Sequence, residues 1–228
     1  MMITVILVVL GFPSSLKTAE SLNFNITNFN DPESAKHMTY QGDGKANNGS
    51  IELNIVSYLF RVGRALYGQP LRLWDSSSGV LTDFSTRFTF TIDKGNDESA
   101  TYGDGFAFYI APRGYQIPPN GAGGTFALFS STSNSYLPEN RVLAVEFDTF
   151  NGTIDPPMQH VGIDDNSLES VASAKFDIDK NLGKKCNALI TYTASNKTLF
   201  VSWSFNGTAT PHSNSSLSHR IDLMEILP

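Results

Sequence analysis

The chain has 228 residues, of which 40% are hydrophobic and 16 are phenylalanine, so it can bury a sizeable core. Its formal net charge of −6 and the lack of a basic run argue against nucleic acids and anionic membranes as partners. The single cysteine, Cys186, excludes an internal disulfide, and its place at the start of an apolar strand predicts a buried, inert thiol.

The N-terminal segment contains a short apolar run, MITVILVVL at residues 2–10, followed by Gly11 and Pro13. This run is too short to span a bilayer, and it predicts a secretory signal peptide over residues 1–20, although basic residues before the run are missing. A hydrophobic N-terminal strand is the alternative. No second apolar span follows, so we expect a secreted chain with one domain over residues 21–228 and no membrane span. N-glycosylation sequons favour secretion, and they lie at Asn25, Asn48, Asn151, Asn196, Asn206 and Asn214.

Most of the remaining chain alternates apolar and polar residues between Gly, Asn, Asp, Ser and Pro, which predicts strands. The clearest strand is FSTRFTFTI, with Phe84, Phe88, Phe90 and Ile92 on one face. Other strands are predicted at residues 22–26, 50–53, 141–150, 172–178, 187–193 and 198–205. Residues 39–44 are expected to form a turn-rich step, and residues 62–67, which precede Pro70, an edge strand or a loop. Without a long amphipathic helix or an internal repeat, the chain is predicted to be an all-β sandwich of two antiparallel sheets.

Two glycine-containing segments are candidates for binding. Asp104 has a glycine on each side and precedes the apolar residues 106–108; a turn before a strand is the simpler interpretation. The segment GAGGT at residues 121–125 would let a ligand approach its backbone, and a flexible surface loop is the alternative.

The segment LAVEFDTFNGTIDPPMQH, residues 143–160, gathers potential metal ligands. Glu146 and Asp148 are two apart on a predicted strand, so they face the same way and would repel each other without a cation. Asp155 starts an Asp-Pro-Pro turn, and His160 ends the segment. Carboxylates suit a hard cation and imidazole suits a transition metal, so the four side chains could hold two metals with Asp148 or Asp155 shared. An edge strand followed by a polar loop is the non-functional alternative.

A pair of carboxylates about 5 Å apart can also hydrolyse a glycosidic bond with retention. Bacterial β-glucanases with a related sandwich typically carry a second glutamate shortly after the aspartate. Here Phe150 and Asn151 follow Thr149, so that acid is missing and a hydrolase is the minor alternative.

Taken together, these segments resemble the legume lectin family, the L-type lectins of plants. The resemblance extends over almost the whole chain after the predicted signal peptide. In the segment with the potential metal ligands its motifs are VEFDTF, DPP and HVGID. The other motifs are VGRALYGQPLRLWD at residues 62–75, the strand at 84–92, GDGFAFYIAP at 103–112 and HVGIDDNSLESV at 160–171. It implies a jelly-roll sandwich that binds glycans without catalysis. A soluble lectin, the extracellular domain of a lectin receptor kinase, and association into homo-oligomers all fit this resemblance.

The resemblance also implies which residues form the site. Glu146, Asp148, Asp155 and His160 would hold a transition metal, usually manganese. Calcium would be held by Asp148, Asp155, the carbonyl of Phe150 and an asparagine, for which Asn151 is the candidate.

For the sugar, the resemblance implies that Asp104, preceded by a cis peptide bond, accepts hydrogen bonds from two hydroxyls. The N–H of Gly124 would donate to the sugar, and the ring of Phe150 would stack on its apolar face. In the family the calcium-binding asparagine also hydrogen-bonds the sugar, so Asn151 is a candidate for sugar binding as well.

The sequence departs from the family pattern in two places. The calcium-binding asparagine normally lies six residues after the glutamate, where this chain has Gly152, and a glycan on Asn151 would block the site. The family continues beyond the equivalent of residues 221–223 into another strand and a loop that tunes sugar choice, so we expect either a truncated product or fragment, or a sandwich lacking a C-terminal strand. Both departures favour the alternative of a lectin-like protein that has lost sugar binding and acts in defence, storage or protein interaction.

Overall fold

The computed structural model describes residues 5–7, 21–54, 60–95, 102–130, 141–150 and 156–228. Apart from two four-residue helices, α1 (Pro32–Ala35) and α2 (Leu223–Ile226), the regular elements of these residues are strands, all paired antiparallel, which confirms the all-β prediction. Neither helix of this part of the chain has the length and hydrophobicity needed to cross a membrane.

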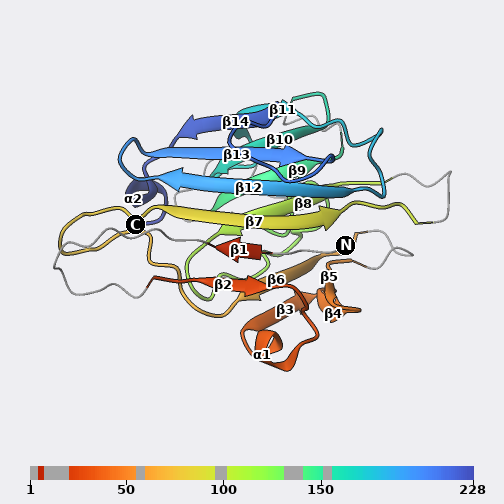
Figure 1. Cartoon of the computed structure of the whole chain (residues 1–228), viewed down its shortest axis with the longest axis horizontal. Helices are drawn as coiled ribbons and strands as arrows, with labels where there is room; N and C mark the ends of the chain where they lie inside the picture. The colour runs from red at the N-terminus through yellow and green to blue at the C-terminus, as the bar shows by residue number, and fades with distance from the viewer. Residues whose placement is uncertain (1–4, 8–20, 55–59, 96–101, 131–140, 151–155) are drawn as a thin grey trace.

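Two sheets pack face to face, one behind the other in Figure 1. The front sheet in this view has the order β14 (Ser215–Arg220), β13 (Thr198–Ser204), β12 (Lys185–Thr193), β7 (Phe84–Thr91), β1 (Val5–Leu7), β2 (Phe24–Ile26). The second sheet has the order β11 (Ser170–Lys175), β10 (His160–Asp165), β9 (Leu143–Asp148), β8 (Gly105–Ile110). Two strand pairs flank them: β3 (Met38–Gly42) with β6 (Gly63–Tyr67), and β4 (Lys45–Asn47) with β5 (Ser50–Glu52).

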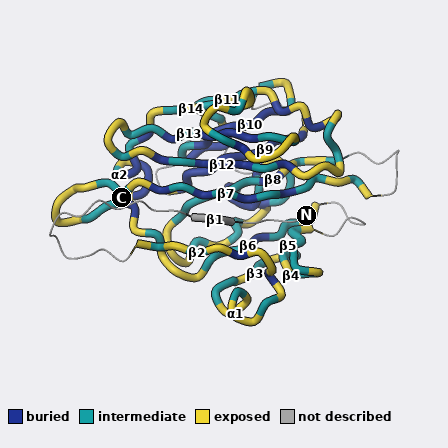
Figure 2. Tube along the Cα trace, in the orientation of Figure 1, coloured by how far each residue is buried: buried dark blue, intermediate teal, exposed yellow. Residues whose placement is uncertain are grey.

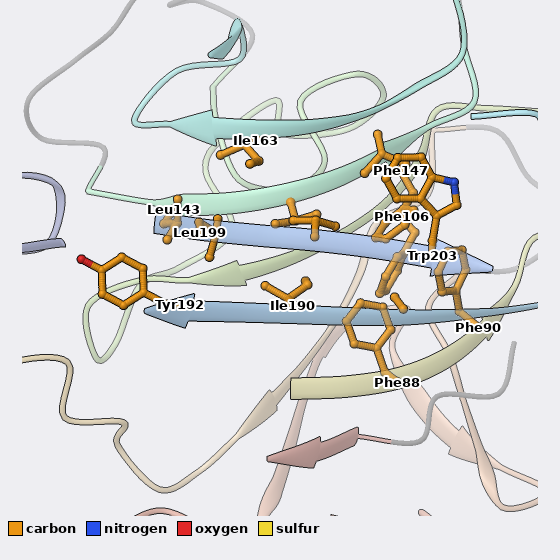
Figure 3. Packing of buried hydrophobic residues seen from close by; sticks show 14 of the residues in the cluster. Phe88, Phe90, Phe106, Leu143, Phe147, Ile163, Ile190, Tyr192, Leu199 and Trp203 are labelled. Carbon is orange, nitrogen blue, oxygen red and sulfur yellow. The ribbon is translucent and has the colours of Figure 1, made fainter. Parts of the chain in front are cut away.

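The main core lies between the two sheets and is rich in phenylalanine (Figure 3). Strand β7 alternates buried and half-buried residues, as its sequence predicts, and its inward side chains include Phe88 and Phe90. The Phe90 ring centroid lies 4.7 Å from that of Phe147 on β9 and 4.9 Å from that of Phe106 on β8. Such ring pairs join the two sheets through apolar contact. Cys186 is buried in the same core, which confirms its prediction, and burial raises the pKa of its thiol to about 12.

Strand β9 is buried on both faces, which the alternating pattern of its sequence does not predict (Figure 2). Its second face contributes Ala144 to a smaller apolar cluster, whose other buried members are Leu128, Phe129, Val142 and Leu168. Because Leu128 and Phe129 follow the glycine-rich segment, this cluster anchors that segment over the sheet, beside the carboxylates of β9.

Several element boundaries differ from their predictions for local reasons. Residues 38–42 form β3 rather than a turn, because β6 pairs with them along their whole length. Strand β11 ends at Lys175, before the predicted end at residue 178, because the chain turns after Phe176, where the N–H of Ile178 donates to Phe176 O at 2.8 Å. Strand β14 was not predicted, since its sequence SSLSHR is mostly polar; it pairs with β13 at the sheet edge.

The N-terminal segment contributes β1, which pairs with both β2 and β7. The pairing of β1 does not test whether residues 1–20 are removed as a signal peptide. The division into a signal peptide at residues 1–20 and a domain at residues 21–228 therefore stays a prediction. The predicted lack of a further C-terminal strand stays a prediction as well.

Candidate functional site

The carboxylates of β9 meet a histidine of the neighbouring strand. Asp148 pairs directly with His160 across the β9–β10 ladder, and Glu146 pairs with Gly162. Glu146, Asp148 and His160 are all buried, and one potential ligand atom from each lies within 4.8 Å of the others. Three of the four side chains predicted as ligands of the transition metal are therefore together, whereas Asp155 lies outside the described residues.

Hydrogen bonds fix the orientation of the imidazole. His160 Nε2 lies 2.9 Å from Glu146 Oε1, and Nδ1 lies 3.0 Å from the carbonyl oxygen of Met158. Burial lowers the pKa of His160, but the hydrogen bond and the charge of Glu146 outweigh burial and raise it to about 9. A protonated imidazole would donate to Glu146 from Nε2, whereas only a neutral imidazole ligates a metal, so metal binding by His160 requires the loss of that proton.

The pocket around Glu146 fits a cation. Glu146 Oε2 is buried and has no hydrogen-bond partner in the described part of the chain, whereas Oε1 accepts from Ser170 Oγ at 2.7 Å. A Cβ on Gly162 would lie 2.5 Å from Glu146 Oε1 and 2.0 Å from Ser170 Oγ, so the lack of a side chain there makes room for the carboxylate. A buried carboxylate oxygen without a partner is costly, and a bound divalent ion would satisfy it.

The end of β9 also holds the backbone of the Asp104 segment. The main-chain carbonyl of Asp104 accepts from the N–H of Thr149 at 2.9 Å and from its hydroxyl at 3.0 Å. One residue further, the N–H of Phe150 donates to Asp148 Oδ1 at 2.6 Å. The Gly103–Asp104 peptide bond is cis, as the resemblance implies. The candidate metal centre and Asp104 are thus connected through two consecutive residues.

Three of the four residues predicted to contact sugar converge, whereas the fourth, Asn151, lies outside the described residues. Ideal Cβ atoms on Gly123 and Gly124 would lie 3.4 Å from Asp104 Oδ2 and 3.9 Å from Oδ1, respectively, so the glycine-rich loop faces the carboxylate closely. A Cβ on Gly103 would lie 3.4 Å from Cδ2 of Phe150, whose side chain is 54% exposed. Phe150 is therefore a surface residue rather than part of the core. Burial raises the pKa of Asp104.

Sequence reasoning missed several residues that build this site. Ser170 and Thr149 act through hydroxyl groups that carry no periodic signal. Gly162 could have been flagged, since a glycine inside an apolar strand marks close approach of another group. Asn151 and Gly152, on which the calcium prediction depends, lie outside the described residues.

The predicted glycosylation positions are accessible in the part of the chain that the structure describes. The exposed sequon asparagines are Asn25, Asn48, Asn196, Asn206 and Asn214. Exposure permits glycosylation but does not test it, so these positions stay predictions.

Comparisons with known proteins converge on one family. The family model of the legume lectin domain matches residues 21–228. The chain is 41% identical over 213 residues to the L-type lectin-domain containing receptor kinase IX.1 of Arabidopsis thaliana, covering 91% of this chain and 32% of that protein. It thus spans about a third of the length of that relative.

Solved structures agree with this match. Peanut lectin superposes with a TM-score of 0.79 at 32% identity, covering 92% of this chain and 86% of that chain. Lectin UEA-II of Ulex europaeus, solved in complex with galactose, gives a TM-score of 0.73 at 35% identity, covering 85% and 80% of the two chains. These likenesses confirm the predicted lectin-type sandwich.

Proposed function

Because the chain belongs to the legume lectin domain family, we propose that it is a secreted protein whose metal-ordered site binds glycans. The legume lectin domain binds carbohydrates without catalysis, so the domain over residues 21–228 is not an enzyme, as its sequence predicts. The matches favour neither a β-glucanase-like hydrolase nor a lectin-like protein that has lost sugar binding.

The observation that carries the proposal is the convergence of Asp104, Gly124 and Phe150 on one patch beside the buried Glu146–Asp148–His160 cluster. A carboxylate, a main-chain N–H and an exposed ring offer an acceptor, a donor and an apolar surface. These are the groups that the hydroxyls and the C–H face of a sugar require. The glycine opposite Asp104 leaves space for a ligand to approach the backbone.

Metals belong to the proposal because the ligand cluster and the sugar site share the end of β9. We assign Glu146, Asp148, Asp155 and His160 to a transition metal such as Mn²⁺. Calcium is assigned to Asp148, Asp155, the carbonyl of Phe150 and Asn151. When bound, the ions would supply positive charge that neutralises the buried carboxylates. Asp148 then remains an acceptor for the N–H of Phe150, which holds that residue beside Gly103.

The proposal is tested by glycan-array binding and calorimetry on chain loaded with Ca²⁺ and Mn²⁺, with galactose and fucose in the sugar panel. Asp104→Asn keeps the shape of the side chain but removes its charge. We expect it to lower glycan affinity at least about tenfold, because a hydrogen bond to a charged group contributes roughly 1.5–3 kcal/mol. Asp43→Asn is the control, since Asp43 pairs with Arg61 outside the site.

The pH dependence provides a second readout. Asp104 accepts from two hydroxyls only as a carboxylate, and burial raises its pKa above the ordinary 3.8. Glycan binding should therefore weaken during acidification at a higher pH than an exposed aspartate would give. No binding to any glycan by the metal-loaded chain, or equal binding by Asp104→Asn, would contradict the proposal.

A further inference from the structure

Arg64, on β6, is a buried cation without a counter-charge in the described residues. Arg64 is only 3% exposed, and none of the ion pairs in this part of the chain includes it. Burial lowers the pKa of its guanidinium. A buried charge is costly unless hydrogen bonds compensate it, so the partners of Arg64 indicate what its position is for.

Its closest partners are main-chain carbonyls at the two ends of the glycine-rich loop, residues 115–127, which contains the GAGGT segment, and Nη1 also donates to Gln41 Oε1 at 3.4 Å. Nη1 donates to Tyr115 O at 2.9 Å, at the start of the loop, and Nη2 donates to Ala127 O, at its end. Nε has no partner among the described residues, so the terminal nitrogens form these contacts. A planar guanidinium can hold two acceptors at once in a fixed geometry, which an ammonium group cannot do.

Two aromatic rings also pack against the guanidinium. Its Cζ lies 5.0 Å from the ring centroid of Tyr109, on β8, and 5.6 Å from that of Tyr115. The hydroxyl of Tyr115 in turn donates to Leu128 O at 2.6 Å. Arg64 and Tyr115 therefore connect the start of the loop, its end and the β8 strand that follows Asp104.

The loop needs such support because its conformation is unfavourable. Phe126 and Ala127 have φ angles of 52° and 61°, a left-handed region that few non-glycine residues adopt. Such residues persist only where surrounding contacts determine them. The N–H of Ala127 donates to Gly121 O at 2.9 Å, and the carbonyl of Ala127 is held by Arg64.

The position of this loop sets the width of the sugar site, since Gly123 and Gly124 face the carboxylate of Asp104. Phe126 also reaches Gly105, where an ideal Cβ would lie 2.9 Å from Cε1 of its ring. We propose that Arg64 is a positioning residue for glycan binding, which clamps both ends of the glycine-rich loop so that Gly124 stays opposite Asp104. This inference rests on the proposed function.

The test compares Arg64→Met and Arg64→Lys with Arg87→Met in the full chain loaded with Ca²⁺ and Mn²⁺. Methionine keeps much of the length of arginine but donates no hydrogen bond. Arg87, on β7, is the matched control because its guanidinium donates to a loop carbonyl, Ala209 O, outside the site. The readouts are glycan affinity, metal affinity by calorimetry, and hydrogen exchange of peptides covering residues 116–129.

We expect Arg64→Met to lower glycan affinity at least about tenfold, since it removes two charge-assisted hydrogen bonds, while both metal affinities stay unchanged. Exchange in residues 116–129 should accelerate, and exchange in β12 should not. Arg64→Lys keeps the charge but donates from one nitrogen only, so it should give a smaller loss in glycan affinity and a smaller acceleration of hydrogen exchange in the loop. Arg87→Met should leave glycan affinity and loop exchange as in the wild type.

Wild-type glycan affinity in Arg64→Met would overturn the inference, and so would parallel loss of metal and glycan binding, which indicates general structural damage. If Arg64→Met does not fold, Arg64→Lys decides by the same readouts: reduced glycan affinity supports the clamp, and unchanged affinity overturns it. If the wild-type chain binds no glycan, the proposed function fails, but loop exchange still decides whether Arg64 positions the loop.

Discussion

Gly162 is the residue on which the geometry of the candidate metal centre depends most directly. It lies opposite Glu146 in the β9–β10 ladder, and the carboxylate and Ser170 Oγ occupy the volume where a Cβ would be. Glycine in a strand interior normally weakens the strand, because it has no side chain to pack and loses more entropy on folding. Here that loss leaves room for the Glu146–Ser170 hydrogen bond.

Gly162→Ala should therefore damage metal binding more than an alanine substitution in a strand usually does. The added Cβ would stand 2.5 Å from Glu146 Oε1, so the carboxylate must move. We expect a loss of about 1–3 kcal/mol in the free energy of unfolding, the usual range for overpacking, and a weaker affinity for Mn²⁺. Urea denaturation of the metal-free protein and manganese calorimetry measure the two effects.

Ser170→Ala separates the two clashes. In the double variant Gly162→Ala, Ser170→Ala the new Cβ no longer clashes with a hydroxyl at residue 170, so part of the lost free energy of unfolding should return. The clash with Glu146 remains, so the affinity for Mn²⁺ should stay low. Unchanged manganese affinity in the single variant Gly162→Ala would mean that Glu146 does not ligate the metal in the orientation seen here.

At the scale of elements, the phenylalanines of β7, β8 and β9 hold the two sheets together. Phe90 is fully buried and packs on Phe106 and Phe147 of the opposite sheet. The same strands end at the site: β9 runs into Thr149 and Phe150, and β8 begins directly after Asp104. The core therefore fixes where the binding residues emerge.

Phe90→Ala should destabilise the fold by about 3–5 kcal/mol, because it removes a buried ring and leaves a cavity between the sheets. For a chain of this size the melting temperature should fall by roughly 2–4 °C for each kcal/mol. Phe60→Ala is the control, since Phe60 is 83% exposed and its truncation should change stability by less than about 0.5 kcal/mol. Similar losses in both variants, measured by denaturant unfolding, would show that the Phe90 contacts do not stabilise the fold.

How far the elements followed from the sequence depends on their length. Strand β7 was predictable because eight residues alternate consistently between core and surface. Strand β5 lies within the strand predicted at residues 50–53, whereas β4 was not predicted, since its three residues are too few for a period of two to show. The burial of both faces of β9 was not predictable from its own residues, because a remote loop, which carries Leu128 and Phe129, covers the second face.

In the whole molecule, too, some features of the site follow from local sequence, whereas others depend on segments distant in sequence. The side-by-side carboxylates of Glu146 and Asp148 follow from strand periodicity, whereas their meeting with His160 needs the β9–β10 register. The contact between Asp104 and the glycine-rich loop was expected only from the family resemblance, since no local pattern links these segments. Arg64 gave a weak signal, a cation in an apolar strand, but its partners lie in a loop distant in sequence.

Metal removal tests the molecule as a whole, because the ligands connect two strands of a buried sheet. A metal that binds only the folded state raises the free energy of unfolding by about 2.7 kcal/mol at a concentration 100 times its dissociation constant. Adding Ca²⁺ and Mn²⁺ to chelator-treated protein should then raise the melting temperature by roughly 5–10 °C. Differential scanning calorimetry at constant pH measures this shift.

Glu146→Gln should remove most of the stabilisation by Mn²⁺, because it replaces a buried charged ligand with a neutral amide. In the metal-free state the same change should lower the free energy of unfolding, because it removes the carboxylate that pairs with the buried His160 across 2.9 Å. Glu33→Gln, at an exposed site on α1, is the control and should respond to metal like the wild type. An equal metal-induced shift in Glu146→Gln and Glu33→Gln would place the stabilising ions elsewhere, and the assignment of the β9–β10 cluster as the metal centre would then be wrong.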